Sequence, residues 1–192
     1  MGRRITDVTS AEFDALFTGF EHTACRLETL QAYDVGYEEE PYRAFLAGHP
    51  QPHDPAKNQW VSMIGNAVRA GKVFQRVHVV REPLTDYLRY ELGWSYPPNV
   101  EAGEDIRILV AQAGSWPMSA RGEILPEPKD YWLFDSSDLW VMEYADDGAF
   151  LSIEQVTEPA MIVTAARRRD AALHQAIPYR DYMRRAELLA AS

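Results

Sequence analysis

Residues 71–94 read GKVFQRVHVVREPLTDYLRYELGW, and this stretch contains a predicted strand followed by a predicted helix. Residues 73–80 form a β-branched apolar run between glycine and proline punctuation, which is typical of a strand covered on both faces. Residues 84–92 follow as the helix, and the pair makes one half of an α/β layer. Arg76 and His78 interrupt the apolar run on one face. If the strand is central, these two basic side chains lie in or beside the core and need partners.

The remaining strand signals predict an α/β fold, with α+β as the alternative. Further apolar or alternating segments are residues 106–111, 131–135, 139–144 and 149–156. The last two flank Asp146-Asp147-Gly148, a strong hairpin signal. Residues 24–33 suit a helix or a strand, and we favour the strand. We predict a single domain over residues 1–192 with a mixed sheet of about five strands, flanked by helices, and one right-handed parallel crossover through residues 83–103.

Helix signals occupy most of the remaining chain. Thr9 and Glu12 form a capping box ahead of an aromatic stripe, which predicts a short helix with its aromatic face in the core. Further helices are predicted over residues 38–48, 54–71 and 157–176, the last of them capped by Thr157. Two adjacent prolines predict an extended connector at residues 95–99, and a segment rich in Gly, Ser and Pro predicts a loop at residues 113–128.

The composition predicts a globular cytoplasmic protein. Hydrophobic residues at 46% and charged residues at 25% of a 192-residue chain are ordinary values for a folded domain. Cys25 is the only cysteine, so we expect neither an intramolecular disulfide nor a cysteine-based zinc site. The first residues carry no apolar stretch of the secretory type, and no run is long enough to cross a membrane. We therefore expect no membrane partner.

The charge distribution disfavours nucleic acid as a partner. The formal net charge is −10, which opposes non-specific binding to phosphate backbones. From Ala160 onward six arginines outnumber three acidic residues, and residues 177–192 form a basic, predicted helical segment. This segment forms a solvated helix face or docks on a partner. Binding of DNA through it is the weakest hypothesis, because the rest of the chain is acidic.

Charged side chains stand among apolar residues at eight positions: Arg26, Glu28, Arg76, His78, Glu82, Arg89, Glu91 and Arg107. One interpretation is structural, because buried arginine and glutamate side chains must pair with each other. The other is a binding pocket at the strand ends, in which Arg76 and Arg107 hold an anionic group. Tyr87, Tyr90 and Trp94 would form its wall. Spacing along the chain does not place Arg26 beside Arg107, so it cannot decide between the two interpretations.

Four separated blocks carry a family resemblance: residues 20–28 (FEHTACRLE), 82–91 (EPLTDYLRYE), 102–107 (AGEDIR) and 132–135 (WLFD). Together they resemble the actinobacterial domain of unknown function DUF6879, over about residues 13–176. The resemblance implies no settled activity. It implies a small cytoplasmic protein encoded beside helix-turn-helix regulators, and so a regulatory partner of that class.

A more distant resemblance is to degenerate phospholipase D-like domains, in which a late strand carries His, Lys and Asp. Asp135 takes the aspartate position, but Pro128 and Asp130 stand at the other two, so this resemblance implies no hydrolysis by that route. No nucleophile elbow, Walker loop, zinc-protease motif or dinucleotide glycine cluster is present in the sequence. Prolines between His49 and His53 prevent helical metal-ligand spacing there. We expect neither a cofactor nor a metal.

Two functional hypotheses remain. The first is a non-catalytic regulatory or binding module for a small anionic ligand, a partner protein, or both. Its predicted ligand-binding residues are Arg26, Glu28, Arg76, Tyr87, Arg89, Glu91, Arg107 and Asp135. The alternative is a small enzyme of a biosynthetic or defence locus. It would use Glu82 or His78 as general acid or base, and Arg76 with Arg107 as an anion clamp.

Overall fold

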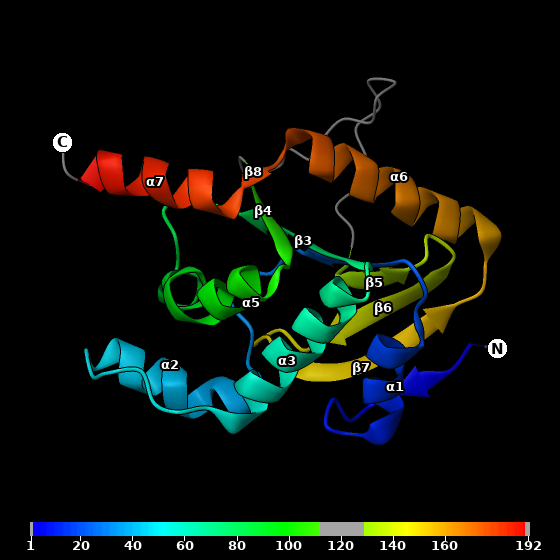
Figure 1. Cartoon of the computed structure of the whole chain (residues 1–192), viewed down its shortest axis with the longest axis horizontal. Coiled ribbons are helices and arrows are strands. Elements are labelled where there is room, and N and C mark those ends of the chain that lie inside the picture. The colour runs from blue at the N-terminus through cyan, green and yellow to red at the C-terminus, as the bar shows by residue number, and fades with distance from the viewer. Residues whose placement is uncertain (1, 112–128, 191–192) are drawn as a thin grey trace.

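The computed structural model describes residues 2–111 and 129–190, which form an eight-stranded mixed sheet with helices on its faces (Figure 1). The helices are α1 (Ala11–Gly19), α2 (Glu39–Leu46), α3 (Pro55–Arg69), α4 (Asp86–Tyr90), α5 (Tyr96–Ala102), α6 (Pro159–Gln175) and α7 (Tyr179–Ala190), with short turns η1 (Gly36–Glu38) and η2 (Glu91–Ser95). The strands are β1 (Arg4–Ile5), β2 (Thr23–Glu28), β3 (Val73–Val80), β4 (Asp105–Val110), β5 (Tyr131–Phe134), β6 (Asp138–Tyr144), β7 (Phe150–Val156) and β8 (Ile177–Pro178).

The sheet confirms the mixed α/β class, but it has more strands than the five or so predicted. Its order is β1-β7-β6-β5-β2-β3-β4-β8. The strands β3 and β4 form the parallel pair that the predicted crossover connects. The strands β2 and β3 form a second parallel pair. The strands β1 and β8 were not predicted, because two-residue strands are too short to show any periodicity. Pro178 is tolerated in β8 because that strand lies at the sheet edge.

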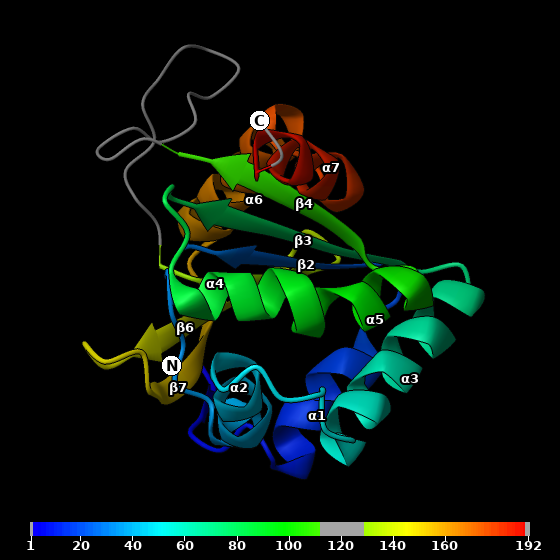
Figure 2. The ribbon, with the colours of Figure 1, turned by 90° about the vertical axis from the view of Figure 1, so that its left-hand side faces the viewer.

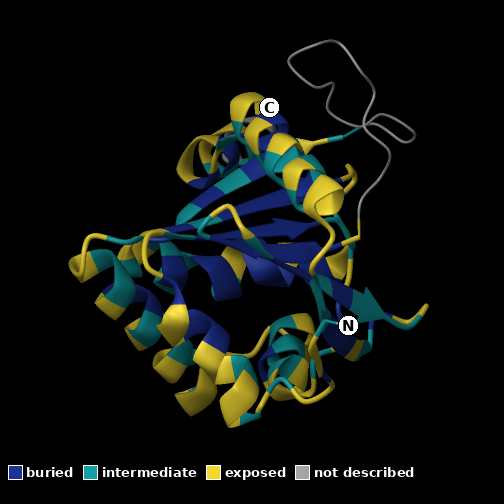
Figure 3. Ribbon diagram, turned by 90° about the vertical axis from the view of Figure 1, so that its right-hand side faces the viewer, coloured by how far each residue is buried: buried dark blue, intermediate teal, exposed yellow. Residues whose placement is uncertain are grey.

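The strand β3 divides its side chains between two different layers. Val77 and Val79 point to the face covered by α6 and belong to a core cluster that includes Ala165 and Ala172 of that helix. Arg76 and His78 alternate with them and therefore point to the opposite face. In Figure 2, α6 lies above the strands β2, β3 and β4, whereas α1, α3 and the helical segment from α4 to α5 lie below them. Beside β4, α7 packs through Tyr179 and Tyr182 against Leu88 and Leu92 of that segment. The central strands are buried and the helices expose their outer faces (Figure 3).

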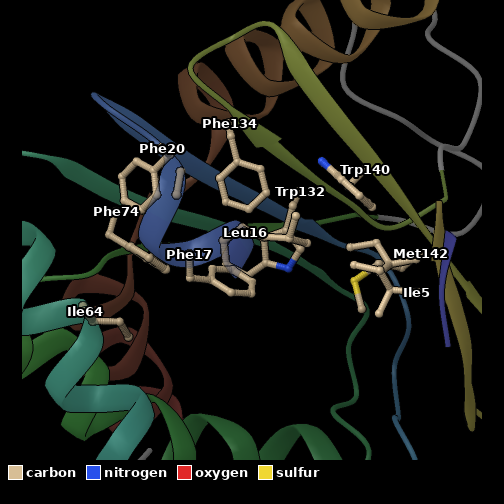
Figure 4. Close-up of a cluster of buried hydrophobic side chains, with 12 residues drawn as sticks. Ile5, Leu16, Phe17, Phe20, Ile64, Phe74, Trp132, Phe134, Trp140 and Met142 are labelled. Carbon is tan, nitrogen blue, oxygen red and sulfur yellow. The ribbon is translucent and has the colours of Figure 1, made fainter. Parts of the chain in front are cut away.

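An aromatic cluster joins α1 and α3 to the sheet (Figure 4). The ring of Phe17 meets the rings of Trp60 and Trp132 edge-on, with centroids 4.9 Å apart in each pair. Phe17 and Phe20 are buried, which confirms the predicted aromatic face of this helix. The predicted cap was wrong by one residue. Ser10 is the N-cap, and its hydroxyl accepts a hydrogen bond from the Phe13 amide at 3.2 Å.

The predicted extended connector at residues 95–99 is wrong, because α4, η2 and α5 form one continuous helical segment. The turn η2 is a π-helix in which the Tyr96 amide donates to the Glu91 carbonyl five residues earlier. Pro97 and Pro98 are the second and third residues of α5, directly after η2. Neither has an N–H to donate back into the preceding turn, so the regular hydrogen-bond pattern is interrupted there without leaving an unpaired amide.

Other local predictions have mixed outcomes. Residues 23–28 form β2, which confirms a strand for the first part of residues 24–33, whereas residues 29–33 lie outside it. Asp54 caps α3 and Pro55 opens it, as predicted. The N-cap of α6 is Glu158 and not Thr157. The loop predicted at residues 113–128 lies outside the described residues. Of the helices described, none combines the length and the hydropathy needed to cross a membrane.

We predict that Phe74→Ala lowers the free energy of unfolding by about 3–5 kcal/mol, because it empties a well-packed site. The Phe74 ring is 1% exposed and packs against Phe17 and Trp132. Val73→Ala is the matched control, because this neighbour points to the opposite face and is 43% exposed. Its expected cost is below about 1 kcal/mol. Denaturant unfolding measures both, and equal losses would contradict the assignment of faces to β3.

Candidate functional site

Buried charged side chains gather on the sheet face that α1, α3 and α5 cover. The buried arginine, histidine, aspartate and glutamate side chains among the described residues are Arg26, Glu28, Arg76, His78, Glu91, Glu104 and Asp130. The strands β2 and β3 bring four of them together, because parallel pairing sets Arg26 beside Arg76 and Glu28 beside His78. Residues two apart on a strand share a face, so all four side chains point the same way.

Glu28 lies between the two arginines and pairs with both. Its Oε1 accepts a hydrogen bond from Nε of Arg26 at 3.3 Å and another from Nη1 of Arg76. Arg76 also donates from Nε to Glu104 at 2.8 Å, and Arg26 donates from Nη2 to Asp130 at 3.1 Å. Burial favours the neutral form of Glu28, but Arg76 and Arg26 outweigh it and lower the pKa of this carboxyl well below its usual value. Both arginines are therefore held by carboxylates on fixed strands and loops.

His78 is fully enclosed beside this network. Its Nε2 lies 2.9 Å from the Leu30 carbonyl oxygen, so that nitrogen carries a proton. Its Nδ1 lies 2.7 Å from the Tyr96 hydroxyl and 3.0 Å from Oε2 of Glu91. Burial lowers the pKa of His78, but the carboxylates of Glu91 and Glu28 outweigh burial and raise it to about 9. A histidine held in this way is an anchored member of the network and has no contact with solvent.

A cavity of about 890 Å³ opens over the network. Arg26, Glu28, Arg76 and Glu91 form its charged floor, and α3 contributes Lys57 to its lining. Its walls are largely aromatic, with side chains from α1, α3, α5, β5 and β6: Phe17, Trp60, Tyr96, Trp132 and Tyr144. This volume lies at the upper end of the range of about 300–1,000 Å³ typical of small-molecule sites.

Several polar atoms that face this cavity have no hydrogen-bond partner. Five buried side-chain atoms of the described residues are unsatisfied, and three of them belong to residues that line the cavity. These three are Nη1 of Arg26, Oδ1 of Asn99 and Oε2 of Glu91, all on side chains at most 4% exposed. Leaving a buried polar group unpaired costs about 1–3 kcal/mol, and more for a charged one. Water or another molecule in the cavity would complete their hydrogen bonds.

Two oppositely charged side chains lie nearer the surface of the same cavity. Lys57 donates from Nζ to the Ser95 hydroxyl at 3.1 Å, and no carboxylate of the described residues forms an ion pair with it. Burial lowers the pKa of Lys57. Glu38 accepts a hydrogen bond from the Tyr87 hydroxyl at 2.6 Å. Burial raises the pKa of Glu38 to about 7, against the opposing effect of that hydrogen bond. One cation and one acid that titrates near neutrality are thus available to a bound molecule.

Comparison with known protein families assigns the chain to a family. The family described as domain of unknown function (DUF6879) matches residues 11–184. The chain belongs to the DUF6879 family. The match begins at the first residue of α1 and ends in α7, so it includes every element that builds the cavity. A search of curated proteins gave no match to this chain.

Of the residues predicted for the site of this family member, six meet at the cavity or directly behind it. Arg26, Glu28, Arg76, Tyr87 and Glu91 line the cavity, and His78 lies behind them against Glu28 and Glu91. Tyr90 and Trp94, predicted as further wall residues, instead pack against α2 through Phe45.

Four other predicted residues lie elsewhere. Arg107 is opposite Val77 in the register, so it points to the other face from Arg76 and pairs with Asp105 at 3.1 Å. The predicted clamp of Arg76 with Arg107 is therefore wrong. Glu82 accepts a hydrogen bond from the Tyr182 hydroxyl. Arg89 pairs with Asp86 on the surface. Asp135 accepts hydrogen bonds from the backbone amides of residues 21–23.

Sequence reasoning missed Glu104 and Asp130, which complete the ion pairs of the two arginines. Glu104 follows Gly103, whose φ of +105° ends α5, and its neighbours in the sequence are typical of a turn. A Cβ on Gly103 would lie 2.8 Å from a methyl of Val68, so this position also requires the close approach that glycine allows. Asp130 stands in a connection outside any periodic pattern. The available signal was charge balance, because two buried arginines require more than one carboxylate.

We predict that Asp130→Asn lowers the free energy of unfolding by about 3–5 kcal/mol, because it leaves Arg26 buried with one partner fewer. Asp130 also accepts hydrogen bonds from Thr29 and from the Tyr33 hydroxyl, and it is 2% exposed. Asp105→Asn is the control, since it removes the same charge from the half-exposed pair with Arg107. The control should lose about 1 kcal/mol or less. Denaturant unfolding compares the two, and similar losses would contradict the dependence of the network on Asp130.

The raised pKa of Glu38 predicts a pH effect on stability. Folding raises this pKa from 4.5 to about 7, so the folded protein binds a proton that the unfolded chain releases, and stability falls as the pH rises through this window. Besides burial, the groups that set the pKa are Tyr87, Glu91, Lys57 and Glu28.

Glu38→Gln removes the penalty and keeps an acceptor for Tyr87. As the pH rises from about 5 to about 8, we expect the free energy of unfolding of the variant to increase by about 1–2 kcal/mol relative to that of wild type. Thermal unfolding across that range measures the difference. A difference between the two proteins that does not change with pH would contradict the assignment.

Proposed function

We propose that this protein is a non-catalytic module that binds a small polar molecule in the cavity over β2 and β3. The observation that carries the proposal is the pair of unsatisfied buried atoms, Nη1 of Arg26 and Oδ1 of Asn99, in the lining of one cavity of about 890 Å³. Natural proteins leave few such atoms unpaired, and their concentration at one cavity is what a binding site requires.

The lining supports a particular ligand chemistry. Arg26 offers an unused guanidinium N–H and Lys57 an ammonium without a carboxylate partner, so an anionic group on the ligand has two donors. Asn99 offers an acceptor, which suits a donor group on the same ligand. Arg76 already forms ion pairs with Glu28 and Glu104, so it holds these carboxylates in place and offers little free charge to a ligand. A small anionic or zwitterionic molecule with a flat apolar part fits these donors and the aromatic walls.

The regulatory part of the proposal rests on the family resemblance. A helix-turn-helix regulator is the partner that the resemblance implies, and ligand binding would be the signal passed to it. A copurified polypeptide of that class would support this part. Ligand binding that proceeds with no such partner would leave the binding module standing by itself.

An enzyme is the second candidate function, and Glu38 is the observation that favours it. This carboxyl lines the cavity and titrates near neutrality, as a general acid or base requires. His78 lies behind the cavity and Glu82 outside its lining, so neither predicted group supports a catalytic role there. Turnover of a bound compound that is lost in Glu38→Gln, while binding is retained, would replace the binding module by an enzyme.

Native mass spectrometry of protein purified without denaturant tests the binding proposal. We expect an additional mass of a few hundred daltons, released on denaturation. Thermal-shift titration with a panel of amino acids, nucleosides and nucleotides then identifies the class. The proposal would be contradicted if the purified protein retains no compound and no member of the panel stabilises it.

Lys57→Gln should weaken binding of the identified compound by about tenfold or more, equivalent to about 1.4 kcal/mol. Lys129→Gln is the matched control, because this lysine pairs with Glu143 on the surface away from the cavity lining. The same loss of affinity in both variants would show that binding depends on overall charge and not on the cavity.

A further inference from the structure

We propose that Glu28, His78 and Glu91 bind one divalent transition-metal ion at the floor of the cavity. Nδ1 of His78 lies 3.0 Å from Oε2 of Glu91 and 3.6 Å from Oε2 of Glu28. One donor atom from each residue lies within 4.8 Å of the other two. For bonds of about 2.1 Å, neighbouring ligand atoms stand about 3.0–3.4 Å apart in octahedral or tetrahedral coordination. The two distances from Nδ1 bracket that range.

Two of the three donor residues, His78 and Glu28, are held by partners on their far sides. Nε2 of His78 donates to the Leu30 carbonyl, which leaves the lone pair of Nδ1 directed at the two carboxylates. Oε1 of Glu28 takes up the hydrogen bonds of both arginines, which leaves Oε2 to face the site. The Tyr96 hydroxyl, 2.7 Å from both Oε2 of Glu28 and Nδ1 of His78, borders the site. Metal-binding histidines and carboxylates are ordinarily oriented by such outer contacts.

Glu91 supplies an independent sign of a missing ligand. Its side chain is 4% exposed, and among the described residues its Oε2 has a hydrogen-bond donor only when His78 is protonated on Nδ1, 3.0 Å away. This oxygen is the one that faces Nδ1 of His78. An unsatisfied buried carboxylate oxygen is costly, whereas a metal ligand at the same position is fully coordinated.

The buried groups of the network carry a net negative charge when His78 is neutral. The described buried groups comprise two guanidinium groups, on Arg26 and Arg76, and four carboxylates, on Glu28, Glu91, Glu104 and Asp130. With a neutral imidazole these groups carry two uncompensated negative charges, equal to the charge of one divalent ion. A proton on His78 compensates half of that charge. A divalent ion at this position would neutralise these carboxylates.

The ligand set indicates the class of metal. One imidazole nitrogen and two carboxylates suit Zn²⁺, Mn²⁺, Fe²⁺ or Co²⁺, since Mg²⁺ and Ca²⁺ prefer all-oxygen sites. Glu28 and Glu91 line the cavity, so the ion would enter from it, and its remaining coordination positions would face a ligand bound there. The metal site does not depend on the identity of that ligand.

Titration of chelator-treated, tag-free protein with Co²⁺, followed by visible absorption and competition with Zn²⁺, tests this inference. We expect one equivalent to bind and to raise the melting temperature. Glu91→Gln keeps the side-chain shape and should weaken binding by more than about 100-fold, because loss of even an outer-shell partner costs about 10–100-fold. Glu101→Gln is the matched control on the same helical segment, at an exposed position, and should bind as wild type does.

Absence of saturable binding of Co²⁺, Zn²⁺ and Mn²⁺ would overturn the inference, as would equal binding by wild type and Glu91→Gln, which would assign the ion to surface histidines. If Glu91→Gln does not fold, anomalous scattering from crystals of wild-type protein grown with Co²⁺ decides the question. A peak between His78 and Glu91 supports the site, and a peak elsewhere overturns it. The titration contains no organic ligand, so its failure leaves the proposed binding function to its own test.

Discussion

The contact of Glu28 with both Arg26 and Arg76 is the constraint on which this half of the molecule depends. Two adjacent parallel strands present like charges side by side, and a single carboxylate between them makes that arrangement tolerable. The pairing in turn requires Glu104 and Asp130, because each guanidinium group has more donors than one shared oxygen can accept. The turn after α5 and the connection before β5 are therefore positioned by the charges of β2 and β3.

Stability alone does not account for so much buried charge. Replacing a buried ion network with well-packed apolar side chains of similar volume is often neutral or stabilising. The other face of the same strands shows this alternative, where Val77 and Val79 pack under α6 without any charge. The polar face differs in having a large cavity above it, and the network holds its donors and acceptors in fixed directions toward that cavity. Fixed directions reduce the reorganisation that binding requires, which is a benefit that apolar packing cannot provide.

Much of the fold, and part of the site, was predictable from the sequence. The run of residues 73–80 identified β3, and strict alternation correctly set Arg76 and His78 on one face. The association of Arg76 with Arg107 failed because the face of a side chain on one strand relative to another depends on register, and a shift of one residue reverses it. Sequence periodicity describes each strand separately. It could not place Asp130, which pairs with Arg26 although the two residues are 104 positions apart in the sequence.

The π-turn at η2 explains how one helical segment delivers Glu91 and Tyr96 to the same site. In a regular α-helix, residues five apart point about 140° away from each other. The wider turn closed by the Tyr96 amide and the Glu91 carbonyl reduces this angle, so both side chains reach His78. The prolines that follow make this turn inexpensive, because neither can donate the amide hydrogen bond that would continue the regular α-helical spacing. The sequence feature that obscured the helix is thus the one that allows the segment to present Glu91 and Tyr96 to the histidine together.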